Sequence, residues 1–146
     1  MLTKTLLRTN TAILVKMTEL IGHEQTIEVY LEELKNTIRS DGVLKKPIVV
    51  DGKHKIIIDG HHRLEALKRL GCQKIPVYFI NYESHMVRIE SWGNTEPITK
   101  DVVIRSALEG KKLPPKTTRH MVRASPHWVH ISHIQKEINI PLEELK

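Results

Sequence analysis

The hydrophobic positions along the chain follow two spacings, one typical of helices and one typical of strands. Apolar side chains recur every three or four residues over 26–39 and over 61–70, which predicts two amphipathic helices. A third, shorter helix is predicted over 99–109. Runs rich in β-branched residues predict strands over these ranges: 11–20, 47–50, 55–59, 75–82, 85–92 and 128–131.

This order of elements predicts an α+β fold, in which a mixed sheet has helices packed around it. Asp51-Gly52-Lys53 is a typical hairpin turn between two of the strands. Residues 110–115 are expected to form a basic, proline-ended linker. A chain of 146 residues can bury most of its apolar surface without disulfides, so we expect a single domain over residues 1–146.

The composition is that of a globular protein in a reducing compartment. Hydrophobic residues make up 40% of the chain and charged residues 27%, which is ordinary for a soluble domain. The single cysteine, Cys72, excludes an internal disulfide. No apolar run approaches the roughly 20 residues that span a bilayer, and the N-terminus lacks the apolar region of a signal peptide. We therefore expect a cytoplasmic protein without a membrane partner; the sequence favours no particular oligomeric state.

Most of the net charge of +6 lies in one segment of the chain. Between Lys100 and Arg123, seven lysines and arginines stand against two acidic residues, a net charge of +5. Such a cluster favours an anionic partner, either nucleic acid or the phosphates of a nucleotide, although a solvated basic loop has the same composition. Aromatic residues make up only 4% of the chain, which is few for a surface that stacks single-stranded bases.

The first candidate binding site lies where a strand meets a helix. A β-branched run at 56–58 leads into Asp59-Gly60-His61-His62-Arg63 and then into the second helix. Gly60 permits a sharp turn, and the free amide groups of the new helix then lie beside two histidines and an arginine. Unpaired amides, the positive end of the helix dipole and cationic side chains, with the two histidines counted among them, together predict a phosphate site. The alternative is an ordinary turn whose polar residues only cap the helix.

A second cluster of phosphate-binding residue types occurs at 116–120. It contains two hydroxyls, two cations and a histidine, contributed by Thr117, Thr118, Lys116, Arg119 and His120. Phosphoryl transfer needs charge neutralisation on both sides of the moving group, usually with the help of Mg²⁺. The chain has no Gly-x-x-x-x-Gly-Lys-Ser/Thr motif, which excludes a P-loop enzyme. A solvated loop is the alternative interpretation of this segment.

Two further sets of residues could carry chemistry. Glu24, in a loop before the first helix, is a candidate general base, although it could also only complement the helix dipole. His127, His130 and His133 occur every third residue, but no acidic residue or cysteine lies near them in sequence. We expect no metal site formed by the protein alone, and a purely structural role for Cys72.

These motifs, in this order, resemble the ParB/sulfiredoxin superfamily, which is marked by a strand–Gly-x-x-Arg–helix phosphate site. Within it, they are most similar to the free L-serine kinases. The segments that carry the resemblance are 23–25, 42–47, 59–63 and 115–120, and the similarity extends over residues 11–145. The resemblance implies a compact ParB/sulfiredoxin-like fold.

The resemblance also implies an activity, which is phosphoryl transfer to the hydroxyl of free L-serine to give O-phospho-L-serine. The partners would be free serine and an adenine nucleotide, with ATP or ADP as donor and with Mg²⁺. Relatives often carry a long insertion between the Trp and Lys-Thr-Thr-Arg-His segments, whereas only 23 residues separate Trp92 from Lys116 here. The compact form is more similar to the ATP-using members, so ATP is the expected donor.

Individual roles follow from the same resemblance. Glu24 is the expected base for the serine hydroxyl. The expected nucleotide- and phosphate-binding residues are Gly60, His61, His62, Arg63, Lys116, Thr117, Thr118, Arg119 and His120. The expected serine-binding residues are Trp92, Asp59, which would arrange the amino acid or the metal, and Thr37, which stands where some relatives have a serine.

The main alternative is a ParB-like DNA-binding protein or nuclease, which the basic segment would suit. ParB-like nucleotide switches usually show Gly-x-Arg-Arg, whereas this chain has Gly60-His61-His62-Arg63. Only 47 residues follow Thr99, and prolines interrupt them, which leaves little room for a helix-turn-helix domain. Nucleic acid is therefore not the expected partner. Sulfiredoxin chemistry is excluded because its nucleophilic cysteine is replaced here by His61.

Overall fold

The centre of the fold is a mixed sheet of four strands. The computed structural model describes residues 11–92 and 97–146. The strands of the sheet lie in the order β1-β5-β3-β4, and their bounds are Ile13–Lys16, Lys74–Ile80, Ile48–Asp51 and Ile57–Asp59. β5 pairs antiparallel with β1 and parallel with β3, and β3 pairs antiparallel with β4. The predicted α+β class with a mixed sheet is confirmed.

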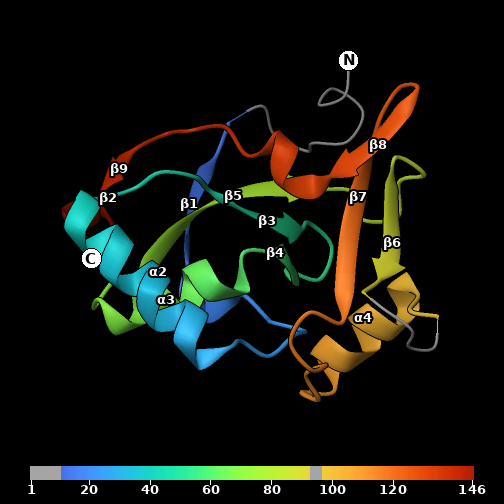
Figure 1. Cartoon of the computed structure of the whole chain (residues 1–146), viewed down its shortest axis with the longest axis horizontal. Coiled ribbons are helices and arrows are strands. Elements are labelled where there is room, and N and C mark those ends of the chain that lie inside the picture. Colours follow the sequence, from blue (N-terminus) through green and yellow to red (C-terminus); the bar gives the residue numbers. More distant parts are fainter. Residues whose placement is uncertain (1–10, 93–96) are drawn as a thin grey trace.

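Two helices cover one face of this sheet. α2 (Glu28–Asp41) and α3 (His61–Arg69) lie side by side in Figure 1. Their buried residues pack in one cluster with inward-facing residues of the sheet. The main members of this cluster are Leu31, Ile38, Leu64, Leu67, Ile48, Val50 and Ile57. Burial of this face holds α3, and therefore its N-terminus, in a fixed place at the end of β4.

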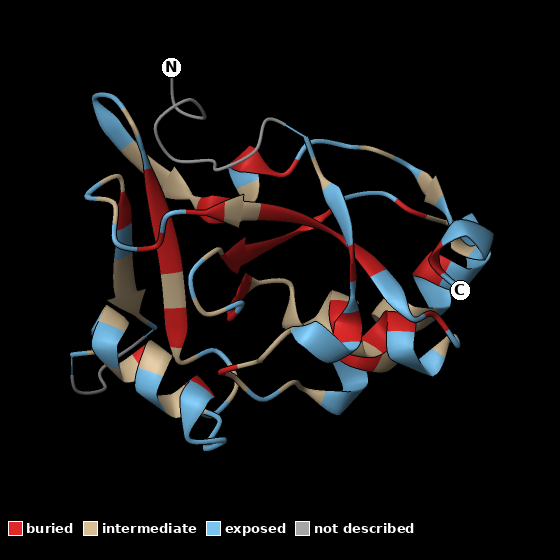
Figure 2. Cartoon of the chain, turned by 180° about the vertical axis from the view of Figure 1, so that it is seen from behind, coloured by how far each residue is buried: buried red, intermediate tan, exposed pale blue. Residues whose placement is uncertain are grey.

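The opposite face of the sheet packs against a second, smaller sheet. Its antiparallel strands are β6 (Val87–Ser91), β7 (Thr118–Ala124) and β8 (His127–His130), with α4 (Lys100–Leu108) beside them. The intervening residues of the central strands, among them Val49 and Ile58, belong to the cluster on this side. Because both faces are covered, the central strands are apolar at successive positions and appear red in Figure 2.

The remaining elements are short. η1 (Met17–Glu19) follows β1, and β2 (Val43–Leu44) pairs with β9 (Ile140–Pro141) near the end of the chain. Two further 3₁₀ helices, η2 (Ile131–Ile134) and η3 (Leu142–Leu145), complete the C-terminal segment. Within the described ranges, no helix has the length and apolar character needed to cross a membrane.

Most predicted elements are present, and the two main differences concern the first strand and residues 118–124. The strand predicted over 11–20 stops at Lys16, where the chain turns into η1. Residues 118–124, which were not predicted as a strand, form β7, the middle strand of the second sheet. The inward side chains of β7 include Thr118 and His120. Because these are polar residues at buried positions, the alternation of hydrophobic and polar residues does not mark the strand.

Candidate active site

The turn between β4 and α3 is formed by Gly60 in a left-handed conformation. Its φ angle is +119°, which L side chains rarely adopt. A Cβ atom at this position would collide with the side chain of Ile48, because it would lie 2.7 Å from Ile48 Cβ and closer still to Ile48 Cγ2. The turn brings the chain directly into α3, whose first amide groups have no partner within the helix. The sequence predicts that an anion binds at these amides, and this stays a prediction.

The two histidines that follow Gly60 act as hydrogen-bond acceptors. The backbone amide of His23 donates to Nε2 of His61 at 3.1 Å, and that of Ile27 donates to Nε2 of His62 at 3.0 Å. Burial lowers the pKa of both rings, that of His61 well below its ordinary value. Treating His61 and His62 as cations was therefore wrong, because their Nε2 lone pairs hold the 23–27 segment against α3. Their proposed contacts with phosphate remain a prediction.

Arg63 and Asp59 belong to a partly buried polar network that also includes Gln135. The Arg63 guanidinium donates to the Pro47 carbonyl oxygen, to Gln135 Oε1 at 2.9 Å and to Asp59 Oδ2 at 3.4 Å. Gln135 Nε2 donates to the same Asp59 oxygen at 2.6 Å. The sequence gives no signal for Gln135, since a single glutamine in the segment that connects η2 to β9 carries no pattern. The network ties the C-terminal segment to the β4–α3 turn.

Glu24 is placed by a short pairing between two distant loops. The 23–25 segment forms a parallel bridge with Leu113, and the Leu113 amide donates to the His23 carbonyl oxygen at 2.8 Å. The Glu24 carboxylate contacts the start of β7. Its Oε1 accepts from the amides of Thr117 and Thr118, each at 2.9 Å, and from the Thr118 hydroxyl at 3.0 Å. Oε2 takes part in none of these three bonds.

The environment of Glu24 suits a proton acceptor. Burial is the strongest influence on the carboxyl and raises its pKa, whereas the hydrogen bonds from Thr117 and Thr118 lower it. The net effect is a pKa above the ordinary value for glutamate. A raised pKa makes the carboxylate a stronger base.

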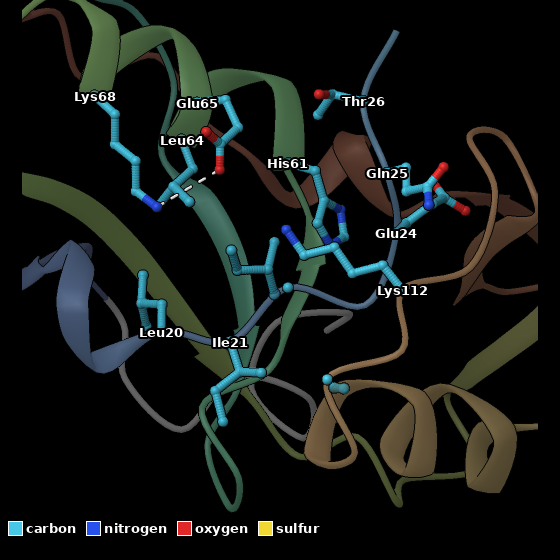
Figure 3. A pocket seen from close by; sticks show the side chains of 14 residues that line it. Leu20, Ile21, Glu24, Gln25, Thr26, His61, Leu64, Glu65, Lys68 and Lys112 are labelled. Atoms are coloured by element: carbon cyan, nitrogen blue, oxygen red, sulfur yellow. Dashed lines mark ion pairs between the residues drawn. The ribbon is translucent and has the colours of Figure 1, made fainter.

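Glu24 and His61 line two cavities. The smaller has a volume of about 300 Å³ and is lined by Glu24, Leu34, Ile58, Asp59, Gly60, His61, His62, Arg63, Thr118, His120 and His130. The larger has a volume of about 640 Å³; Leu20, Ile21 and Leu64 contribute apolar surface to it, and Gln25, Lys68 and Lys112 contribute polar groups. Figure 3 shows this larger cavity, with His61 beside Lys112 and with the Glu65–Lys68 ion pair at one side. Two cavities that share a carboxylate can hold two reactants.

Strand β7 divides the predicted 116–120 cluster between its two faces. Thr118 and His120 are buried and line the smaller cavity. Arg119, between them, has its guanidinium 4.9 Å from the ring centre of Trp92, whose indole N–H donates to the Thr118 carbonyl oxygen at 3.0 Å. Arg119 Nε is buried and has no hydrogen-bond partner among the described residues. The structure thus pairs Trp92 with Arg119, and neither lines the two cavities described above.

The side chains of three other predicted residues have partners other than Glu24. Lys116 has its ammonium 4.9 Å from the ring centre of Tyr30, and the Thr117 hydroxyl donates to the Pro114 carbonyl oxygen. Thr37 is exposed on α2, where its hydroxyl donates to the Glu33 carbonyl oxygen at 3.0 Å. The structure therefore does not bring Thr37 to either cavity, because the residue lies one turn beyond Leu34 on the helix.

Among the described residues, no group of three or more His, Cys, Asp or Glu side chains is placed to hold a metal ion. Cys72 is buried in the cluster beneath α2 and α3, and burial raises the pKa of its thiol. A raised thiol pKa reduces the thiolate fraction, which agrees with a structural role.

The buried histidines make the stability of the fold depend on pH. Burial lowers the pKa of His23 to about 4 and that of His120 well below 6.5. Below pH 6.5 the unfolded chain binds protons that these rings cannot bind in the fold. We therefore expect the free energy of unfolding to be highest above pH 6.5 and to fall below it, by up to about 1.4 kcal/mol per pH unit for each ring.

Urea unfolding at stepped pH measures this effect. The raised pKa of Glu24 acts in the opposite direction but involves one proton, whereas four histidines, His23, His61, His62 and His120, have lowered pKa values. His120→Gln can keep the hydrogen bond to the Tyr82 hydroxyl (2.8 Å). This variant should reduce the slope of the free energy of unfolding against pH below pH 6.5. His127→Gln, at an exposed position, is the matched control and should leave the slope unchanged. Equal slopes in the wild type, His120→Gln and His127→Gln would show that the buried histidine rings titrate normally.

Comparison with known protein families identifies the fold. The family model of the ParB N-terminal domain matches residues 4–94, which is more than half of the chain. The chain belongs to the ParB N-terminal domain family. The matched residues of this ParB domain include Glu24 and the β4–α3 turn, whereas β7, with Thr118, lies beyond the match.

Several relatives of this ParB-family chain are L-serine kinases. The ATP-dependent L-serine kinase of Desulfurococcus mucosus is 36% identical over 102 residues, which cover 64% of this chain and 40% of that protein. The ADP-dependent L-serine kinase SerK of Thermococcus kodakarensis is 29% identical over 84 residues, which cover 55% of this chain and 35% of that protein. The chain therefore spans less than half the length of both relatives.

A solved structure shows that the similarity in fold extends over the whole chain. A free serine kinase in complex with AMP matches this structure with a TM-score of 0.79 at 17% identity, and the match covers 98% of this chain and 97% of that chain. Strands β7 and β8 and helix α4, which lie outside the matched ParB segment, are therefore part of a known fold.

Proposed function

We propose that this chain is a nucleotide-dependent kinase that phosphorylates the hydroxyl of free L-serine. The observation that carries the proposal is the placement of Glu24. Its Oε1 is held by three hydrogen bonds from β7, and its carboxylate lies on the wall shared by two cavities. The L-serine kinases among the relatives support the same activity for this chain.

In the proposed reaction Glu24 is the general base. Oε2, which lies outside the three bonds that hold Oε1, takes the proton of the serine hydroxyl. The hydroxyl oxygen then forms a bond to the terminal phosphorus of the nucleotide as the bond to the bridging oxygen breaks. Because Oε1 is fixed on the β7 backbone, the carboxylate needs little reorganisation when it accepts the proton.

The N-terminus of α3 is the proposed site for the nucleotide phosphates. Gly60, His61, His62 and Arg63 line the smaller cavity at this N-terminus, and the positive end of the helix dipole favours an anion there. The residues also fit a Mg²⁺ ion carried by the nucleotide. Asp59 lines the cavity, and both of its hydrogen bonds end on Oδ2, so Oδ1 can contribute one ligand. When bound, Mg²⁺ would neutralise charge on the phosphates.

ATP is the proposed donor, and the cytoplasm is the proposed location. The relatives include both ATP-dependent and ADP-dependent enzymes, so a nucleotide donor is common to them, while the choice of ATP rests on the compact form of the chain. Free serine and adenine nucleotides are both cytoplasmic metabolites, which is why a cytoplasmic location belongs to the same proposal. A single domain over residues 1–146 is proposed as the unit of activity.

A direct assay tests this function. The purified chain is incubated with L-serine, Mg²⁺ and either ATP or ADP, and O-phosphoserine is measured directly. Product with one nucleotide establishes the kinase and names its donor. No product with either nucleotide, together with salt-sensitive retention of DNA by the same sample, would overturn the proposal in favour of the DNA-binding alternative.

Arg119 is proposed to contact the transferred phosphoryl group. Its buried Nε lacks an acceptor among the described residues, which leaves a donor available for an anion. We expect Arg119→Ala to reduce kcat/KM by about 10²-fold. Arg123→Ala is the matched control, because Arg123 lies on the same strand and also stacks on a tryptophan, with its guanidinium 5.6 Å from the Trp128 ring centre. Equal activity of the two variants would remove Arg119 from the site.

A further inference from the structure

His23 is a buried residue next to Glu24 that the proposed reaction does not use. Its side chain has no exposed surface and lines neither of the two cavities. Nδ1 lies 2.7 Å from the carbonyl oxygen of Ile57. Because a carbonyl oxygen only accepts, Nδ1 carries the hydrogen. Burial lowers the pKa of His23 to about 4, so the ring is neutral at pH 7 and Nε2 has a free lone pair.

The Thr118 hydroxyl lies between two acceptors. Its oxygen is 3.2 Å from His23 Nε2 and 3.0 Å from Glu24 Oε1. A hydroxyl has one hydrogen to donate, and an ionised carboxylate and an unprotonated ring nitrogen can only accept it. The hydroxyl can therefore satisfy His23 or Glu24, but not both at once. A donor bond to a carboxylate favours its charged form. Glu24 is therefore more basic whenever the Thr118 hydroxyl donates to His23 instead.

We propose that His23 is a positioning residue that competes with Glu24 for the hydroxyl hydrogen of Thr118 and thereby keeps Glu24 a stronger base. The inference rests on the proposed function for its catalytic meaning, but the competition itself is a property of the free protein. His23 does not touch the substrates. It acts through Thr118, which lines the smaller cavity together with Glu24.

Other titratable groups line the cavities together with Glu24 and stay constant in the comparison. The groups that line one of the two cavities with it are Asp59, His61, His62, Arg63, Glu65, Lys68, Lys112, His120 and His130. The Lys116 amide also lies near the carboxylate. Since these groups are the same in every variant, a difference between variants of His23 and Thr118 reports on the hydroxyl alone.

The test is a titration of the Glu24 carboxyl in the substrate-free protein. Selective ¹³C labelling of glutamate gives one NMR signal that disappears in Glu24→Gln, and its chemical shift is followed with pH. His23→Asn can keep the donor to Ile57 but removes the acceptor at Nε2. The Thr118 hydroxyl then donates to Glu24 alone, so we expect the Glu24 pKa to fall by about one unit.

Three further variants separate competition from a loss of structure. His23→Gln can place an acceptor oxygen near the Nε2 position and should restore the wild-type pKa. Thr118→Val removes the hydroxyl and should raise the pKa. The double variant should match Thr118→Val, because His23 then has no hydroxyl to compete for. Backbone NMR spectra confirm that each variant folds.

The acid limb of kcat/KM against pH should move in the same direction as the titration. An unchanged Glu24 pKa in folded His23→Asn overturns the inference, even if the chain phosphorylates serine. A pKa that follows the expected series in a protein without kinase activity supports the competition and overturns the proposed function instead. The two failures are therefore distinguishable.

Discussion

We expect the Glu24→Gln variant to lose about 10³-fold or more of its turnover with L-serine while it keeps its affinity for the nucleotide. A glutamine can still accept the Thr117 and Thr118 amides through its carbonyl oxygen, at the positions that Oε1 occupies now. The side chain should therefore stay in place. It can no longer accept a proton, because an amide is not a base near neutral pH, so only the chemical step is lost.

Three measurements check this expectation. Single-turnover formation of O-phosphoserine reports the chemical step, calorimetric titration reports nucleotide affinity, and thermal unfolding reports stability. Glu109→Gln is the matched control, since it makes the same chemical change at an exposed residue after α4 and should leave all three unchanged. Parallel loss of turnover, nucleotide affinity and stability in Glu24→Gln would instead give Glu24 a structural role.

The second large effect is expected from Gly60→Ala. The added Cβ would lie 2.7 Å from Ile48 Cβ and closer to Ile48 Cγ2, and the backbone would be held at a φ of +119°. Ile48 is fully buried in β3 and cannot move aside without disturbing the central sheet. Backbone strain and overpacking act together here, so we expect the free energy of unfolding to fall by about 3 kcal/mol.

Gly71→Ala separates the two causes. Gly71 also has a positive φ, +81°, but nothing lies within 4 Å of the position of its added Cβ. This variant should therefore show only the backbone strain, about 1 kcal/mol. Urea unfolding of both variants gives the comparison. Similar losses in the two proteins would mean that the collision with Ile48 is relieved by a small shift of the β4–α3 turn.

At the histidines after Gly60, the local structure is predicted correctly but the charge of the side chains is not. The sequence predicts a strand, a sharp turn and a helix N-terminus at 56–63, and the structure has all three. The sequence also suggests cations at His61 and His62. In the structure both rings accept amide hydrogens from residues 38 and 35 positions away, which only neutral rings can do through Nε2. The hydrogen-bond partner of each ring determines its charge, and that partner is distant in sequence.

Strand β7 shows the same limit for secondary structure. The alternation of buried and exposed residues along 118–124 is present, but Thr118 and His120 occupy buried positions. A polar residue can be buried when another part of the chain supplies its hydrogen-bond partner, as Tyr82 does for His120 at 2.8 Å. Neither Tyr82 nor Gln135 carries a sequence signal for this role. The predicted serine-binding residue Thr37, by contrast, is held by its own helix.

The sequence by itself determined the elements whose signals are local. These are the two amphipathic helices, the apolar central strands, the turn at Gly60 and the residue types of the candidate site. Their causes are side-chain spacing and backbone preference, which act over a few residues. Only the tertiary structure decided that Glu24 and Thr118, 94 positions apart, share a hydrogen bond and that Thr118 also reaches His23. Burial, pKa and hydrogen-bond direction depend on contacts between distant segments, and those contacts exist only once the two sheets have packed together.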